Sequence, residues 1–115
     1  MRCPWCHNFY LIPYDFANHS EIITEEDFFS FLDQRNHFLD EIVITGGEPT
    51  IQSDLPELCE QVRKMGLAVK IDTNGTNPGV LNRLLKEKLV DYIAMDVKTD
   101  LDRYNQLFRE NIDAN

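Results

Sequence analysis

Apolar residues follow two alternating patterns along the chain. In one pattern they form short runs of strand length, and in the other they recur at the spacing of one helix face. The runs predict strands over 41–45, 67–71 and 90–95, and the helical spacing predicts helices over about 25–37, 54–65 and 78–87. We also predict a loop over residues 1–21 and a last short helix, capped by Asp100, that contains Leu101, Tyr104, Leu107 and Phe108.

Polar and glycine residues mark the ends of these elements. Thr24 and Asp27 resemble a capping box at the start of the first helix. Gly66 is placed to end the second helix, and Asn77 followed by Pro78 is a favourable start for the third. Strands and helices that alternate in this way form βαβ units. We therefore predict an α/β fold in one domain over residues 1–115, with a parallel sheet and the helices outside it.

The composition is that of a globular protein and narrows the range of partners. Of the 115 residues, 43% are hydrophobic and 27% are charged, and the formal net charge is −9. Without a run of Lys or Arg, such a chain is not expected to bind nucleic acid or an anionic membrane, because either needs a basic surface. No apolar stretch approaches the roughly 18 residues of a membrane span. With 3 cysteines and no export signal, the chain is expected to be cytoplasmic with reduced thiols.

Polar residues follow each of the three predicted strands, at 45–50, 72–75 and 96–98. The carboxyl ends of parallel strands lie at one edge of a sheet, which is where ligands bind in such folds. Gly46 and Gly47 would let the backbone approach a ligand closely, and Glu48 adds an acceptor for a cation or an amine. An ordinary turn between strand and loop is the alternative explanation for the two glycines.

Two carboxylates and a lysine are expected at the same edge. Asp72 and Asp96, together with backbone carbonyls, have the chemistry of a hard-cation site, and Lys98 follows closely. Turn formation and helix capping are the alternative explanation for Asp72 and Asn74. A solvated surface residue is the alternative for Lys98.

Two cysteines lie near the amino end, at Cys3 and Cys6, and His7 and Asn8 follow them. Thiolates at this spacing can hold a soft metal ion. His7 has the chemistry of a ligand, a base or a hydrogen-bonding group. Cys59 falls on the apolar side of a predicted helix and is expected in the core. A thioredoxin-like redox pair is an alternative for the first two cysteines, although no strand precedes them.

In combination, these residues resemble the radical S-adenosylmethionine superfamily. They look most like the activating enzymes of glycyl-radical enzymes, in particular the activator of anaerobic ribonucleoside-triphosphate reductase. The segments that carry the resemblance are Arg2-Cys3-Pro4-Trp5-Cys6-His7-Asn8, Ile44-Thr45-Gly46-Gly47-Glu48-Pro49-Thr50, Asp72-Thr73-Asn74-Gly75-Thr76-Asn77-Pro78 and Asp91-Tyr92-Ile93-Ala94-Met95-Asp96-Val97-Lys98.

The resemblance implies a partial (β/α)6 barrel that holds a [4Fe–4S] cluster through three cysteines and S-adenosylmethionine on the fourth iron. By position, Cys3 and Cys6 would be cluster ligands, and Gly46, Gly47 and Glu48 would meet the methionine amino group. Asp72 and Asp96 would help hold a monovalent cation beside the cofactor carboxylate, with Lys98 in the same pocket. His7 and Asn8 would lie by the cofactor or brace the cluster loop.

The implied reaction is reductive cleavage of S-adenosylmethionine to a 5′-deoxyadenosyl radical. This radical removes a hydrogen atom from a backbone glycine of a partner enzyme, here anaerobic ribonucleotide reductase. A reducing donor such as flavodoxin or ferredoxin would supply the electron. The cofactor carries the difficult chemistry, and the protein orients it and excludes water.

The chain departs from the family pattern at both ends. The first cluster cysteine would precede Met1, and the later barrel strands would follow Asn115. We therefore expect an internal piece of a longer barrel, from either a misplaced start or a decayed copy. A polypeptide of these residues alone is expected to hold a cluster weakly, because two thiolates replace three. The alternatives are a remnant that only binds partners or metal, and another radical enzyme such as a pyruvate formate-lyase activase or a deazaguanine-forming synthase.

Overall fold

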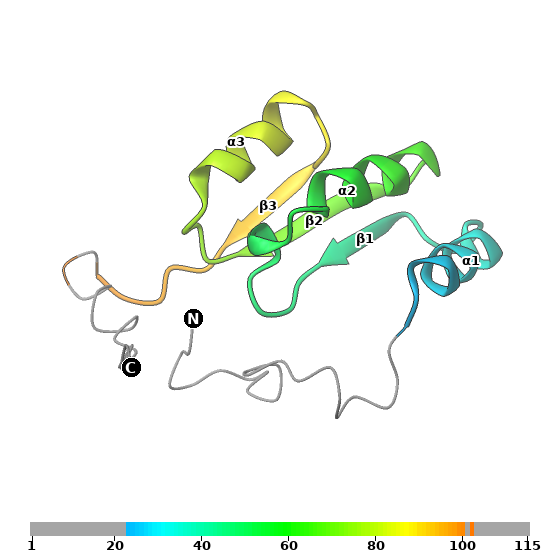
Figure 1. Cartoon of the computed structure of the whole chain (residues 1–115), viewed down its shortest axis with the longest axis horizontal. Helices are drawn as coiled ribbons and strands as arrows, with labels where there is room; N and C mark the ends of the chain where they lie inside the picture. The colour runs from blue at the N-terminus through cyan, green and yellow to red at the C-terminus, as the bar shows by residue number, and fades with distance from the viewer. Residues whose placement is uncertain (1–22, 101, 103–115) are drawn as a thin grey trace.

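The structure is a computed structural model, and it describes residues 23–100 and 102 of the chain. Its centre is a three-stranded parallel sheet in the order β1-β2-β3 (Figure 1). The strands are β1 (Glu41–Ile44), β2 (Ala68–Thr73) and β3 (Tyr92–Met95). In register, Ile44 lies beside Ile71, and Thr73 lies beside Met95. The carboxyl ends of the three strands therefore share one edge of the sheet.

Helices α2 (Leu55–Lys64) and α3 (Pro78–Lys86) cover the same face of this sheet (Figure 1). A short 3-10 helix, η3 (Pro49–Ile51), lies between β1 and α2. Helix α1 (Glu25–Arg35) precedes β1 and lies near the amino end of that strand. The crossovers after β1 and β2 return the chain to the amino edge of the sheet, which keeps the three strands parallel.

The core lies between the sheet and the helices on its covered face. In β2, Val69, Ile71 and Thr73 are buried, whereas Lys70 and Asp72 alternate with them and point to the opposite face. Nine apolar residues, none more than 8% exposed, form the core: Leu32, Leu55, Cys59, Val62, Leu67, Val69, Ile71, Leu84 and Val90. The alternation therefore separates an apolar face under the helices from a polar face that carries charges.

The predicted strands and helices from 25 to 95 are confirmed, with ends that differ by up to two residues. Thr24 is confirmed as the N-cap of α1, because its Oγ1 accepts a bond from Asp27 N at 3.1 Å and donates to the Asp27 carboxylate at 2.6 Å. Gly66 ends the α2 region with φ +85°, as expected of a glycine after a helix. The predicted loop over 1–21 and the helix after Asp100 lie outside the described residues, apart from Asp102.

Asn77 occupies the predicted N-cap position of α3, but its side chain does not cap the helix. Instead, its Nδ2 donates to the carbonyl oxygen of Thr50 at 2.9 Å. The bond ties the loop after β1 to the start of α3. A capping role for this side chain is therefore wrong, because a partner distant in sequence competes for the amide.

The amino edge of the sheet is held by Asp91. Its carboxylate accepts bonds from Arg63 Nη1 at 2.5 Å and from Val69 N at 2.8 Å. Both bonds lower the pKa of Asp91, and the bond from Arg63 has the larger effect. This contact joins the end of α2, the start of β2 and the start of β3 at the edge opposite to the polar strand ends.

No helix in the described part of the chain is long and apolar enough to cross a membrane.

Candidate functional site

The three polar clusters meet at the carboxyl edge of the sheet. Gly46 and Gly47 follow β1, Asn74 follows β2, and Asp96 follows β3. Asp96 N donates to the carbonyl oxygen of Thr73 at 2.9 Å, so the segment after β3 stays beside the end of β2. Asp72 lies inside β2, one residue before its end. The parallel order thus brings residues from three separate segments to one edge.

The Gly46–Gly47 turn leaves open space beside its backbone. Gly46 has φ +136°, a conformation that favours glycine. A Cβ built at Gly46 or at Gly47 would meet no atom within 4 Å. Gly47 has no positive φ, so neither backbone torsion nor crowding within the described protein explains a glycine at this position. Space that a side chain would fill is instead suited to a ligand that approaches the backbone.

Glu48 fastens this turn to the end of β2. Its side chain is buried, and Oε1 accepts bonds from Thr50 N at 3.2 Å, Thr50 Oγ1 at 2.5 Å and Thr73 Oγ1 at 2.6 Å. Oε2 accepts a bond from Asn74 N at 2.8 Å. Burial alone would raise the pKa of Glu48, but these bonds together lower it. The carboxylate therefore serves as a charged brace between two strand ends, a role that the sequence did not reveal.

The turn after β2 is shaped by its own polar groups. Asn74 Oδ1 accepts bonds from Thr76 N at 2.9 Å and Thr76 Oγ1 at 2.6 Å, which is an Asx turn. Gly75 has φ +74°, and a Cβ there would lie 2.4 Å from Met95 Sδ. The positive φ favours glycine here, and a larger residue would also displace the Met95 side chain.

Both predicted carboxylates have lysine partners. Asp72 Oδ1 lies 2.8 Å from Lys70 Nζ, on the face of β2 that points away from the helices. Asp96 Oδ2 lies 2.5 Å from Lys98 Nζ on the segment after β3. Among residues 23–100, no group of three or more His, Cys, Asp or Glu side chains could hold a metal ion. The geometry thus gives no support to the expected monovalent cation.

A depression of about 410 Å³ lies next to the turn after β1. Its lining includes Thr45, Gly47, Gln52, Leu55 and Leu58, from β1's loop, η3 and α2. No residue of β2 or β3 lines it. Asp72 and Asp96 therefore do not share this depression with Gly47.

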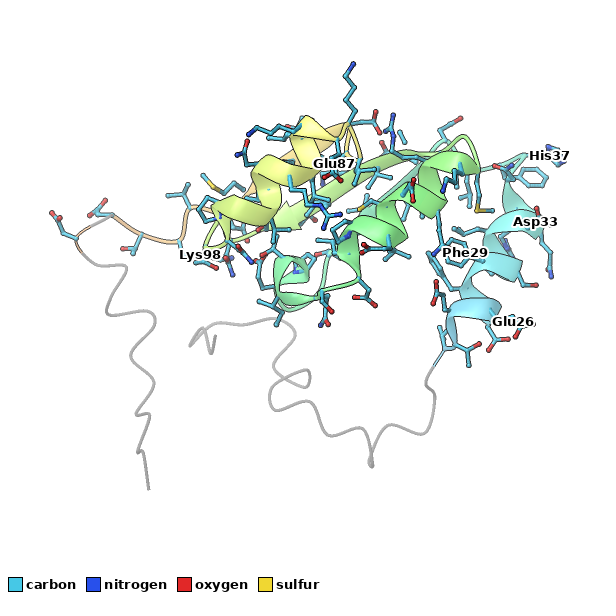
Figure 2. All side chains as sticks on the ribbon, turned by 45° about the horizontal axis from the view of Figure 1, so that its top comes forward. Glu26, Phe29, Asp33, His37, Glu87 and Lys98 are labelled. Carbon is cyan, nitrogen blue, oxygen red and sulfur yellow. The ribbon has the colours of Figure 1, made fainter. Side chains whose placement is uncertain are left out.

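The cysteines and histidines divide between two regions. Cys3, Cys6, His7 and Asn8 lie outside the described residues, so their expected roles stay predictions. Cys59 is fully buried, as expected, and burial raises the pKa of its thiol to about 11. His37 lies beyond α1, at the other end of the described fold from Lys98 (Figure 2). It therefore has no part in the site.

Comparison with known proteins settles the family. Residues 1–114 match the sequence profile of the Radical SAM superfamily. The chain belongs to the radical SAM superfamily. This confirms the resemblance inferred from the sequence motifs, and the three parallel strands with their helices are consistent with a fragment of a radical SAM barrel.

Several curated proteins are similar to this radical SAM chain. One from Methanocaldococcus jannaschii, named "Putative glycyl-radical enzyme activating enzyme", is 43% identical over 110 residues, which is 95% of this chain and 43% of the relative. A second protein of that organism with the same description is 41% identical over 63 residues, covering 55% of this chain and 24% of the relative. The Fe-coproporphyrin III synthase of Methanosarcina barkeri is 33% identical over 102 residues, which is 89% of this chain and 24% of the relative.

The radical SAM chain spans less than half the length of these curated relatives, at 43%, 24% and 24%. No solved structure matches it. The superfamily implies S-adenosylmethionine and a [4Fe–4S] cluster. The open backbone at Gly46 and Gly47 fits a small cofactor that approaches the carboxyl edge of the sheet.

Proposed function

We propose that this chain binds the methionine part of S-adenosylmethionine at the carboxyl edge of its sheet. The observation that carries the proposal is the open space beside Gly46 and Gly47, in a turn that Glu48 holds rigidly to β2. A rigid turn that exposes its backbone can bind an amino group without the cost of ordering a loop.

The other residues take roles around this turn. Gly46 and Gly47 offer backbone groups to the methionine amino group, and Glu48 keeps them in place. Lys98 and Asp96, after β3, lie near the cofactor carboxylate, and Asp72 projects from the uncovered face of β2. All of these residues lie at or next to the carboxyl edge of the sheet, which is where ligands bind in parallel α/β folds.

Cys3 and Cys6 supply two thiolates to a [4Fe–4S] cluster, and a third cysteine is needed to complete the set. His7 and Asn8 lie beside the cofactor or brace the cluster loop. When bound, the cluster supplies the electron that cleaves S-adenosylmethionine. This chain's own residues bind the cofactor, orient it and keep water from it.

We also propose that the whole enzyme installs a glycyl radical on a partner enzyme. Two relatives whose names describe glycyl-radical enzyme activating enzymes support this activity. The motif resemblance favours anaerobic ribonucleotide reductase as the partner and flavodoxin or ferredoxin as the electron donor. We propose a cytoplasmic location for the chain, which agrees with the reduced thiols expected of it.

Substitution of Gly47 tests the binding site. Gly47→Ala places a methyl group in space that no described residue of the chain fills, so the fold should be unchanged. Calorimetric titration with S-adenosylmethionine should show weaker binding by the variant and an unchanged Tm. Gly79→Ala is the matched control, because its Cβ would lie 3.9 Å from Asn77 Oδ1, an ordinary contact on α3. Equal affinities of wild type and Gly47→Ala would contradict the proposed site.

A further inference from the structure

The two carboxylates at the site carry their own counter-charges. Lys70 Nζ lies 2.8 Å from Asp72, and Lys98 Nζ lies 2.5 Å from Asp96. Figure 2 shows Lys98 on the segment beyond the carboxyl end of the sheet. The four side chains sum to a charge of zero at neutral pH, because two ammonium groups balance two carboxylates.

The Lys70 pair is the less solvated of the two. Its side chains are 29% and 38% exposed, against 35% and 70% for Lys98 and Asp96. Asp72 Oδ1 is shielded from solvent and lies 2.8 Å from Lys70 Nζ, but the angles of this ion pair are not those of a hydrogen bond. The contact with Asp72 raises the pKa of Lys70, with smaller contributions from Glu41 and Tyr92, so the ammonium stays charged.

A monovalent cation at Asp72 and Asp96 would have to displace these ammonium groups. Lys70 lies two positions from Asp72 on the same face of one strand, so its ammonium group is tethered within reach of the carboxylate. A free Na⁺ or K⁺ ion would have to displace this tethered group and also give up its own water. These residues therefore do not fit a monovalent cation.

We propose that Lys70 and Lys98 provide, from within the chain, the positive charge that a bound monovalent cation would provide. The site then accepts a ligand carboxylate without Na⁺ or K⁺. Lys70 acts as a positioning residue, because it neutralises and orients Asp72. The ligand part of this inference rests on the proposed function, but the cation part does not.

Cation binding can be followed directly by a Tl⁺ titration of the 115-residue chain, with ¹⁵N amide shifts as the readout and choline nitrate holding the ionic strength constant. Wild type should show no saturable shift at Asp72 or Asp96. Lys70→Met removes the ammonium but keeps the length of the side chain, so a saturable shift should appear at Asp72. Lys70→Arg keeps the charge and should behave as wild type does.

Lys64→Met is the matched control, because Lys64 pairs with Glu60 at 3.2 Å on the outer surface of α2. It removes the same charge and should not create a Tl⁺ site at Asp72. Amide spectra and Tm of every variant report whether the fold is intact. Saturable Tl⁺ binding to wild type at Asp72 or Asp96 would overturn the proposal. A folded Lys70→Met variant that binds no Tl⁺ would overturn it as well.

A second arm separates this inference from the proposed function. Titration with S-adenosylmethionine in KCl and in choline chloride should give the same affinity for wild type. A higher affinity in KCl would overturn the proposal that Lys70 and Lys98 replace a bound monovalent cation. Absence of binding in both salts would instead overturn the proposed cofactor site, while the Tl⁺ arm, which contains no S-adenosylmethionine, still decides the cation question.

Discussion

Replacement of Glu48 by Gln is the most informative perturbation of the fold near the site. Glu48 is 8% exposed, and its carboxylate accepts four hydrogen bonds from Thr50, Thr73 and Asn74. In Glu48→Gln the amide oxygen can replace Oε1, which accepts three of the bonds. The amide nitrogen then replaces Oε2 and faces the backbone N–H of Asn74. Both groups are donors, so no hydrogen bond can form between them.

The variant thus loses one charge-assisted bond and leaves a partly buried N–H without an acceptor. Each such loss lowers the free energy of unfolding by about 1–3 kcal/mol. Part of this loss is offset, because a neutral amide is easier to bury than a carboxylate. We expect the free energy of unfolding to fall by about 2 kcal/mol, measured by urea denaturation at neutral pH. Glu57→Gln is the control, because Glu57 is exposed and contacts Arg83 only at 3.9 Å.

The pH dependence gives a second test of the same reasoning. Hydrogen bonds hold the pKa of Glu48 below its usual value of 4.5 despite burial. A group with a lowered folded-state pKa stabilises the fold above its unfolded-state pKa, and the contribution is lost as the pH falls through the folded-state value. The difference between wild type and Glu48→Gln should therefore shrink as the pH falls below 4.5.

The reasoning would be refuted by an unfolding free energy within about 0.5 kcal/mol of wild type, the range of an ordinary surface substitution. If Glu48→Gln does not fold, Thr73→Val removes the hydroxyl that donates to Glu48 and accepts from Gly75 N, and it leaves three bonds to Glu48. It should cost about 1–3 kcal/mol.

Three further predictions follow from the described contacts. Cys59 should resist thiol reagents in the folded chain at neutral pH and react only after unfolding, because its buried thiol has a pKa of about 11. Gly75→Ala should lower the free energy of unfolding by about 1–2 kcal/mol, because φ is +74° and Met95 Sδ lies 2.4 Å from the added Cβ. Asp91→Asn should cost about 1 kcal/mol or less in urea denaturation, since its bonds to Val69 and Arg63 are partly exposed to solvent.

The order and type of the elements could be predicted because each depends on local periodicity. Apolar runs of four to six residues and helical spacing are visible within short windows, and the parallel sheet follows from their alternation. The common edge of the polar clusters follows in turn from the parallel sheet. The family was predictable for a similar reason, since its motifs are short and contiguous.

The side-chain contacts between segments could not be predicted in this way. Glu48 meets Thr73 and Asn74 across 25 and 26 positions of sequence, and Asn77 reaches back to Thr50. No local pattern specifies which distant donor a carboxylate will accept. Lys70 was missed for another reason, because it lies inside an apolar run. Its spacing of two from Asp72 in a strand was the signal that placed both on one face.

The most direct test of the account is to map where S-adenosylmethionine binds, by following ¹⁵N amide shifts of the chain during titration. The account predicts that the amides of Gly46, Gly47 and Asp96 shift first and saturate together. Gly66 and Asp91, at the opposite edge of the sheet, should not shift. Saturating shifts at Gly66 and Asp91, with none at Gly46 and Gly47, would contradict it.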